Sequence, residues 1–270
     1  MFFIYCICLY AVNLLEIKKI KLERKIRVGA VSYLNTKPLI YAFENGEMQQ
    51  EIELIMGFPS KIAAMLKNDE IDIGLVPVAI IPTLKEYHII SDYCIGCDGE
   101  VASVCLFSEV PLEEIEKILL DYQSQTSVEL LKILIKNFWK IDPVIEKADA
   151  GYENNIKGNT AGLVIGNRAL VQRKKSKYIY DLGEEWKNFT GLPFVFATWV
   201  SNKSLPADFI KDFNSATKHS LEKINIIVKA LDYNFYDLHK YYTKNLVYIF
   251  TDRLKTGMNT FLNMINDRSN

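Results

Sequence analysis

Strands and helices alternate at the start of the globular part of the chain, and this order constrains the fold more than any other feature. Residues 26–31 alternate in polarity and are rich in β-formers, which predicts a strand. Residues 51–56 and 71–76 predict two more strands, and helices are predicted from near Pro38 and over 61–68. A β-α-β-α-β order is typical of a parallel sheet covered by helices, in which ligands bind beyond the carboxyl ends of the strands.

The rest of the chain continues this pattern. Further strands are expected at residues 89–90, 101–107 and 162–166, with an amphipathic helix at 128–139 and almost wholly helical structure from Pro206 onward. We therefore predict an α/β fold of two lobes, each a mostly parallel sheet flanked by helices.

No stretch of the sequence resembles a linker, so we predict that the lobes are discontinuous. The first lobe would hold residues 25–106 and 198–270, and the second lobe would hold residues 107–197. Two crossings of this kind form a hinge, and the cleft between the lobes is the place where a ligand is expected.

The charge balance argues against a polyanionic partner. The chain has 32 basic and 33 acidic residues, a formal net charge of −1, so we expect no nucleic acid partner and no stable membrane association. Five cysteines are too few, and odd in number, for a disulfide framework, and the Cys94–Cys97 pair lacks the second pair of a zinc site. The three histidines lie outside every polar motif, so we expect neither a metal nor a cofactor.

Residues 1–24 form an apolar and then basic extension. The apolar run from Phe2 to Leu15 is shorter than the about 20 residues that span a bilayer. A secretory signal has its basic residues before the apolar run, whereas here they follow it. We expect a cytoplasmic protein whose translation start is mis-called; a segment packed on the body or a membrane anchor are the alternatives.

The first polar motif follows the first strand. Ser32, Tyr33, Asn35, Thr36 and Lys37 bring hydroxyl, amide and ammonium groups into one strand-to-helix turn, where free backbone N–H groups also point outward. This combination predicts an anion site. A capped helix without a ligand is the alternative.

The second motif precedes the helix predicted at 128–139. Ser124 or Thr126 can cap this helix, and together with Ser127 they place three hydroxyls beside exposed N–H groups. A carboxylate would fit there, although a plain capped helix explains the same residues.

Two further motifs are less distinctive. Ser103 is expected within a strand, on the same face as Val101 and Cys105, and a lone serine there is usually structural. The turn at Gly191 and Leu192, which precedes an apolar strand, could bring backbone close to a ligand.

Taken together, these segments resemble the chorismate dehydratase family. Residues 32–39 (SYLNTKPL) resemble its N-terminal signature, and residues 99–104, 124–127 and 181–197 follow in family order. The resemblance runs from about Ile26 to the C-terminus. It implies a fold similar to type II periplasmic binding proteins, and an activity that converts chorismate to 3-[(1-carboxyvinyl)oxy]benzoate and water, the first step of the futalosine route to menaquinone.

The resemblance also implies roles for the polar residues. Asn35 and Ser103 would be catalytic, orienting the enolpyruvyl arm or the departing hydroxyl. Substrate binding would fall to a larger set, namely Ser32, Tyr33, Thr36, Ser124, Thr126, Ser127, Gly191 and Leu192. Hydroxyls and amides are poor bases at neutral pH, so we expect the substrate's own enolpyruvyl carboxylate to take the proton.

The chain departs from the family pattern at three positions. Gln125 stands where arginine is common, Asn167 where aspartate is common, and Ala102 where a basic residue is frequent. These losses of charge affect the expected binding of carboxylates more than the reaction. The alternative function is that of a non-catalytic solute-binding protein for a small carboxylate on the same fold.

Overall fold

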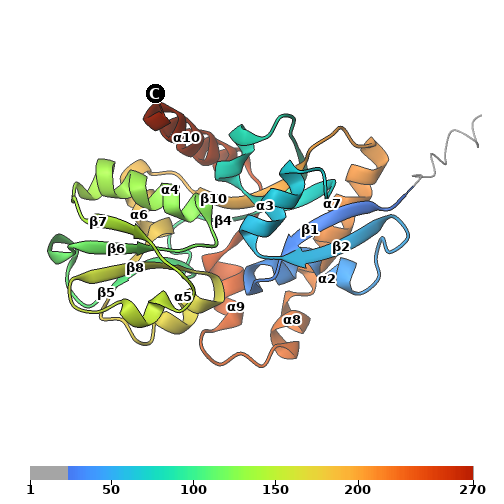
Figure 1. Ribbon diagram of the computed structural model, residues 1–270. Coiled ribbons are helices and arrows are strands. Elements are labelled where there is room, and N and C mark those ends of the chain that lie inside the picture. Colours follow the sequence, from blue (N-terminus) through green and yellow to red (C-terminus); the bar gives the residue numbers. More distant parts are fainter. Residues whose placement is uncertain (1–23, 270) are drawn as a thin grey trace, which may run out of the picture.

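A six-stranded sheet forms the centre of the first lobe (Figure 1). The computed structural model describes residues 24–269, and the expectations for residues 1–23 lie outside this range. The strand order is β11 (Val247–Ile249), β4 (His88–Cys97), β10 (Phe194–Ser201), β3 (Ile73–Pro77), β1 (Ile26–Val31) and β2 (Ile52–Gly57). β1 runs parallel to both β2 and β3, as the sequence predicts.

Two helices connect these parallel strands. α2 (Lys37–Glu44) follows β1 through a short 3-10 turn, η1 (Leu34–Thr36), and α3 (Pro59–Lys67) follows β2. Each helix has a proline in its first turn and buries one apolar face. The predicted capping of α2 by a side chain is wrong, because η1 turns the chain into the helix without any side-chain cap.

The second lobe repeats the same plan around five strands. Their order is β7 (Val144–Lys147), β6 (Lys117–Leu120), β8 (Thr160–Ile165), β5 (Val104–Ser108) and β9 (Tyr178–Asp181). Its helices are α4 (Gln125–Ile133), which continues into the π-helical turn η4 (Leu134–Trp139), then α5 (Gly166–Gln172) and α6 (Leu182–Thr190).

The strands that carry the chain between the lobes give both sheets a mixed character. β5 is antiparallel to β8 and β9, and β10 is antiparallel to β3 and β4. The expectation of mostly parallel sheets is therefore wrong, since each crossing strand enters its sheet from the opposite end. β5 belongs wholly to the second sheet and β10 wholly to the first, so the boundaries expected at residues 106 and 197 fall inside these two strands.

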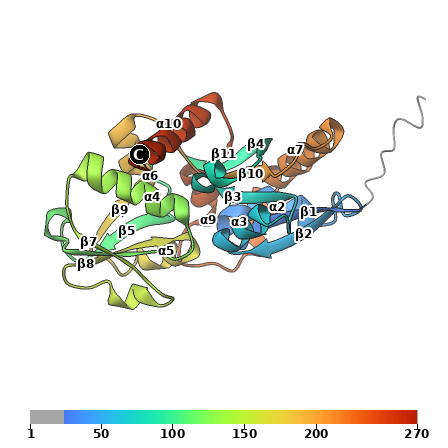
Figure 2. The same ribbon diagram turned by 45° about the horizontal axis from the view of Figure 1, so that its top comes forward.

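The C-terminal part covers the first lobe and reaches the second. It comprises α7 (Ala207–Glu222), α8 (Ile224–Ala230), α9 (Leu238–Lys240), the π-helical turn η6 (Tyr241–Asn245), β11 and α10 (Asp252–Ser269). The almost wholly helical expectation missed β11, a three-residue edge strand. α10 packs on β10 of the first lobe and on α4 of the second (Figure 2). None of the helices within residues 24–269 combines the length and apolar character needed to span a membrane.

Candidate active site between the lobes

A cavity of about 50 Å³ lies between the two lobes and is lined by residues of both. Its polar lining consists of Tyr33, Asn35, Ser103, Ser124 and Ser127. The other lining residues are apolar or glycine, so no charged side chain lines this cavity. Five residues from three separate sequence motifs therefore meet where the carboxyl ends of β1 and β3 face the second lobe.

A hydrogen bond from the C-terminal part of the chain holds the backbone of Asn35 in place. The Tyr248 hydroxyl donates a 2.9 Å hydrogen bond to the Asn35 carbonyl, and the Thr36 hydroxyl lies 3.4 Å from the Asn35 Oδ1. Thr36 itself is fully buried and does not line the cavity. Ser32 also lies outside the cavity lining, and its backbone N–H pairs with the Gly57 carbonyl at 2.9 Å. The loop thus presents Tyr33 and Asn35 and uses its other polar groups for structure.

Ser103 lies in a turn before β5 and not in a strand, which corrects the sequence expectation. Its backbone N–H donates to the Val101 carbonyl at 2.8 Å, and its carbonyl accepts from Gly166 N at 2.7 Å. The Ser103 hydroxyl is buried beside the Tyr241 phenol, yet it has no well-aligned hydrogen-bond partner among the described residues. A buried hydroxyl without a partner is costly, and here it faces the cavity.

The start of α4 contributes two hydroxyls from the second lobe. Ser124 caps the helix as predicted, accepting a 3.3 Å hydrogen bond from Ser127 N, and the two hydroxyls lie 3.1 Å apart. Thr126 points elsewhere: its hydroxyl accepts a 3.1 Å hydrogen bond from Ala79 N of the first lobe. Thr126 therefore joins the lobes and does not line the cavity.

Two more contacts hold the lobes together at Tyr33 and Leu34. The Tyr33 hydroxyl donates to the Gln123 side chain, and Leu34 N donates to the Asn167 Oδ1 at 3.1 Å. Burial, with the nearby Asp121 carboxylate, raises the pKa of Tyr33, so this phenol stays protonated and remains a donor. Sequence reasoning missed Gln123, and it treated Asn167 only as a loss of charge.

Behind Gln123 lies a buried ion pair. Arg168 donates to the Asp121 Oδ2 at 2.6 Å and to the Gln123 Oε1 at 3.0 Å. It also pairs with Glu153 at 2.6 Å, while the Asp121 side chain is fully buried. Burial raises the pKa of Asp121, and Arg168 opposes that shift. This network fixes the Gln123 Oε1, which accepts the hydrogen bond from the Tyr33 hydroxyl.

Gly166 allows the close approach of the lobes. Its φ is +62°, and a Cβ built on it would lie 3.1 Å from the Tyr33 ring. A side chain here would be strained and would also push the ring away. The glycine that ends the predicted strand at 162–166 was the signal, but only the fold shows that Tyr33 packs against it.

Gly191 and Leu192 do not belong to the cavity, so the structure corrects their expected place. Gly191 ends α6 in the left-handed conformation, with φ +73°, and its carbonyl accepts from Arg253 at 2.8 Å. From the same motif, Phe196 and Ala197 of β10 line the cavity instead.

No acid or histidine lines the cavity. Glu100, the acid nearest to Ser103 in the sequence, pairs with Arg173 and accepts a 3.0 Å hydrogen bond from Asn245. Within residues 24–269, no three histidine, cysteine, aspartate or glutamate side chains gather in a way that could hold a metal ion. Cys94 and Cys97 are buried free thiols, and burial raises the pKa of both.

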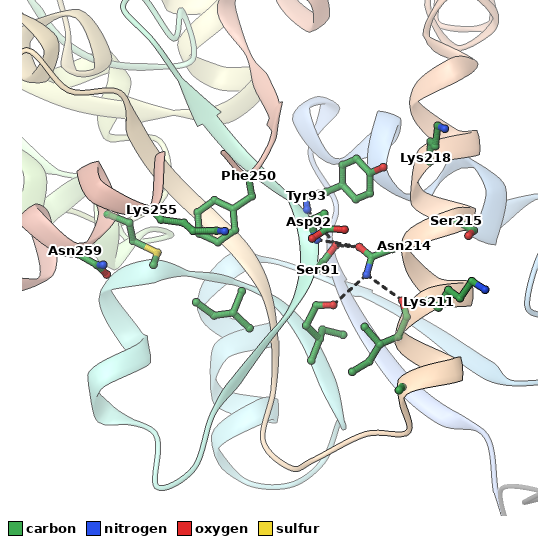
Figure 3. A pocket seen from close by; sticks show the side chains of 15 residues that line it. Ser91, Asp92, Tyr93, Lys211, Asn214, Ser215, Lys218, Phe250, Lys255 and Asn259 are labelled. Atoms are coloured by element: carbon green, nitrogen blue, oxygen red, sulfur yellow. Dashed lines mark hydrogen bonds between the residues drawn. The ribbon is translucent and has the colours of Figure 1, made fainter. Parts of the chain in front are cut away.

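A larger groove of about 820 Å³ lies on the first lobe alone, along β4 and α7 (Figure 3). Its best-ordered polar group is Asn214, which accepts from the Ser91 hydroxyl at 2.8 Å and from Asp92 N at 2.9 Å and donates to the Ile90 carbonyl at 3.2 Å. Asn214 thus hydrogen-bonds to backbone groups of β4 that do not pair with β11, and so protects the edge of the sheet. This groove is lined by the first lobe alone, whereas the inter-lobe cavity collects polar residues of three sequence motifs from both lobes.

The fold defines a class: a two-lobed α/β protein with the architecture of the periplasmic binding proteins. A solved structure from Archaeoglobus fulgidus has a TM-score of 0.71 at 15% identity, covering 92% of this chain and 99% of that one. A Candida albicans protein described as having the generic periplasmic binding protein fold has a TM-score of 0.60 at 13% identity and covers 90% of each chain. The fold predicted from the sequence is thereby confirmed.

The chain belongs to the menaquinone biosynthesis family, whose sequence profile matches residues 26–267. A chorismate dehydratase of Campylobacter jejuni is 28% identical over 244 residues, covering 87% of this chain and 95% of that protein. A chorismate dehydratase of Thermus thermophilus is 24% identical over 223 residues, covering 75% of this chain and 80% of that protein. These matches agree with the family resemblance seen in the sequence.

Proposed function

We propose that this protein is a hydro-lyase that converts chorismate to 3-[(1-carboxyvinyl)oxy]benzoate and water. The observation that carries the proposal is the inter-lobe cavity, where Asn35 and the Ser103 hydroxyl, which has no well-aligned partner among the described residues, meet two hydroxyls at the start of α4. Membership of the menaquinone biosynthesis family and the likeness to chorismate dehydratases give the substrate.

The chemistry suits a lining without charges. A proton leaves the ring carbon that bears the ether, and the resulting anion is conjugated with the ring carboxylate. Hydroxide then leaves the neighbouring carbon and the ring becomes aromatic. Since aromaticity drives the reaction, the protein needs to orient the substrate and stabilise developing charge with fixed donors.

The substrate supplies the base in this proposal. The lining holds no acid or histidine, and Glu100 is engaged by Arg173, which makes it a poor base. The enolpyruvyl carboxylate of chorismate would take the proton, with Asn35 and Ser103 holding that arm. Ser124 and Ser127 would bind a carboxylate at the positive end of α4.

Binding requires the lobes to separate and close again. The cavity volume of about 50 Å³ is far below the roughly 300–1,000 Å³ of typical small-molecule sites. Opening breaks contacts between the lobes, among them those made by Tyr33, Leu34 and Thr126. Closure on the substrate then remakes these contacts and excludes water from the reacting atoms.

The direct test is incubation of the purified protein with chorismate and identification of the product by mass spectrometry and NMR. The expected product has lost one water and has an aromatic ring. Ser103→Ala should slow its formation, and Ser215→Ala, at an exposed serine of α7 outside the inter-lobe cavity, is the matched control. Chorismate that binds and is recovered unchanged would point instead to a solute-binding protein.

The substrate-assisted step has its own test. Chorismate with its enolpyruvyl carboxylate converted to an amide should not be dehydrated, because the amide cannot take the proton. Dehydration of this analogue near the rate of chorismate would exclude the substrate as the base.

A further inference from the structure

The turn that carries Ser103 has an unusual backbone. Ala102 has a φ of +64°, and Ser103 N donates to the Val101 carbonyl at 2.8 Å, which closes a three-residue turn. A positive φ at the centre of such a turn is rare and strained for any residue other than glycine. A strained conformation persists only where the surrounding structure enforces it.

A buried carboxylate binds the N–H groups of this turn, and Arg173 donates to the Ala102 carbonyl at 3.3 Å. Asp181 accepts a hydrogen bond from Val101 N at 2.9 Å with its Oδ1 and from Ala102 N at 2.7 Å with its Oδ2. Hydrogen bonds to an ionised acceptor are the stronger kind, and here two consecutive N–H groups share one rigid group. The carboxylate therefore binds the backbone in a shape that an alanine would not adopt by itself.

Asp181 is well fixed for this task. It ends β9, pairs across the sheet with Cys105, and caps α6 through the N–H groups of Gly183 and Glu184. Its side chain is 4% exposed, and Arg173 lies 3.6 Å from its Oδ2. Burial raises the pKa of Asp181 to about 6 against the lowering effect of the bound N–H groups, so the carboxyl is mostly ionised at neutral pH.

The turn lies at a decisive place in the fold. It ends the first crossing between the lobes, directly before β5. Ser103 is the last residue of the turn and lines the cavity with a polar group. Its carbonyl is held by Gly166 N, so the Asp181 contacts on one side and the Gly166 contact on the other fix its backbone. Its hydroxyl lies beside the Tyr241 phenol and has no well-aligned hydrogen-bond partner among the described residues.

We propose that Asp181 is a positioning residue: it enforces the left-handed turn at Ala102 and so directs the Ser103 hydroxyl at the substrate. The inference rests on the proposed dehydration, since it assigns Ser103 to that reaction. Asp181 also caps α6 and does not line the cavity, so its effect on the reaction would pass through the turn.

The central variant is Asp181→Asn, which keeps the size of the side chain but turns one acceptor into a donor facing an N–H group. A displacement of about 1 Å at a catalytic group costs on the order of 100-fold. We expect kcat for chorismate to fall by that order with a much smaller change in KM. Asp237→Asn, which alters the aspartate that caps α9, is the matched control and should leave kcat unchanged.

Two combinations separate positioning from general destabilisation. In a Ser103→Ala background, Asp181→Asn should cause no further fall in kcat, whereas a purely structural role would lower kcat by the same factor in both backgrounds. Ala102→Gly removes the cost of the positive φ, so adding it to Asp181→Asn should restore most of the lost turnover. If Asp181→Asn does not fold alone, Ala102→Gly is compared with and without Asp181→Asn, and a 100-fold difference between these two would refute the inference.

Hydrogen exchange gives a readout that does not depend on turnover. The amides of Val101 and Ala102 should exchange faster in Asp181→Asn than in the wild-type protein. Unchanged exchange, or equal losses of kcat with and without Ser103, would overturn the positioning role while leaving the dehydration intact. If the wild-type protein does not dehydrate chorismate but the exchange result is as expected, the proposed function is refuted. The contact by which Asp181 holds the turn would then still stand.

Discussion

Replacing Thr126 with valine tests whether closure of the lobes limits substrate binding. Valine has nearly the shape of threonine but cannot accept the 3.1 Å hydrogen bond from Ala79 N. In the closed protein this N–H would lie unpaired beside a side chain that is 0% exposed. In the open protein it would reach water, so the penalty falls on the closed state alone.

The size of the effect follows from that penalty. A buried donor without a partner costs about 1–3 kcal/mol. Closure would weaken by about 5- to 150-fold, since a coupling free energy of this size corresponds to that factor. An affinity that depends on the closed fraction falls in proportion. We therefore expect KM for chorismate to rise within this range, with kcat nearly unchanged because the closed complex still has Asn35 and Ser103 in place.

Steady-state kinetics and calorimetric binding of the product measure the change. Thr126→Ser keeps the hydroxyl and is the matched control, so it should stay close to the wild type. An unchanged KM in Thr126→Val would refute the closure argument. A fall in kcat alone would also refute it, because that result means that the Thr126 hydroxyl acts on the substrate.

Three other changes test separate parts of the structure. Asn35→Ala should lower turnover by about 10²–10³-fold, the cost of one preorganised donor, while Asn45→Ala on the exposed end of α2 should not; near-normal turnover in the first variant would remove this loop from the active site. Arg168→Met leaves Asp121 buried without its cation, so urea unfolding should show a loss of about 3–5 kcal/mol, and a loss below about 1 kcal/mol would mean that the pair behaves as an exposed one. Burial alone would raise the pKa of Asp72, but hydrogen bonds from two arginines and a lysine hold that pKa well below its usual range. The stabilising contribution of Asp72 is therefore present above about pH 4 and lost as pH falls further. Unfolding measured between pH 2 and about pH 6 should show this loss in the wild type and not in Asp72→Asn.

The first half of the first lobe was readable because its signals are local, whereas β6, β7 and β9 of the second lobe were not predicted. The alternation in residues 26–31, the proline at the start of α2 and the apolar run of β3 each specify an element within about ten residues. The crossing strands carry no such information. β10 is buried throughout and lies between β3 and β4, which end 117 and 97 residues before it begins, so only the assembled sheet shows its direction.

The candidate site divides in the same way. The loop at residues 32–38 and the start of α4 can be recognised in the sequence by clustered polar residues next to a helix, and both reach the cavity. Within each cluster, however, the sequence does not say which hydroxyl faces inward. Thr126 and Ser127 are adjacent residues that both carry a hydroxyl. Thr126 accepts a hydrogen bond from Ala79 N of the other lobe, whereas Ser127 lines the cavity. This choice depends on the rotation of α4, which packing of its apolar face fixes.

Ser103 shows why a lone polar residue can matter more than a cluster. A strand assignment made its hydroxyl look structural, because the sequence around it alternates as a strand does. The assignment failed at Ala102, where the hydrogen bonds that Val101 N and Ala102 N donate to Asp181, 79 residues beyond Ala102 in the chain, outweigh the local preference for an extended backbone. In a cavity lined by neutral donors, no charged side chain marks the centre. The mark is a buried polar atom without a well-aligned partner among the described residues, together with the distant contact that fixes the backbone carrying it.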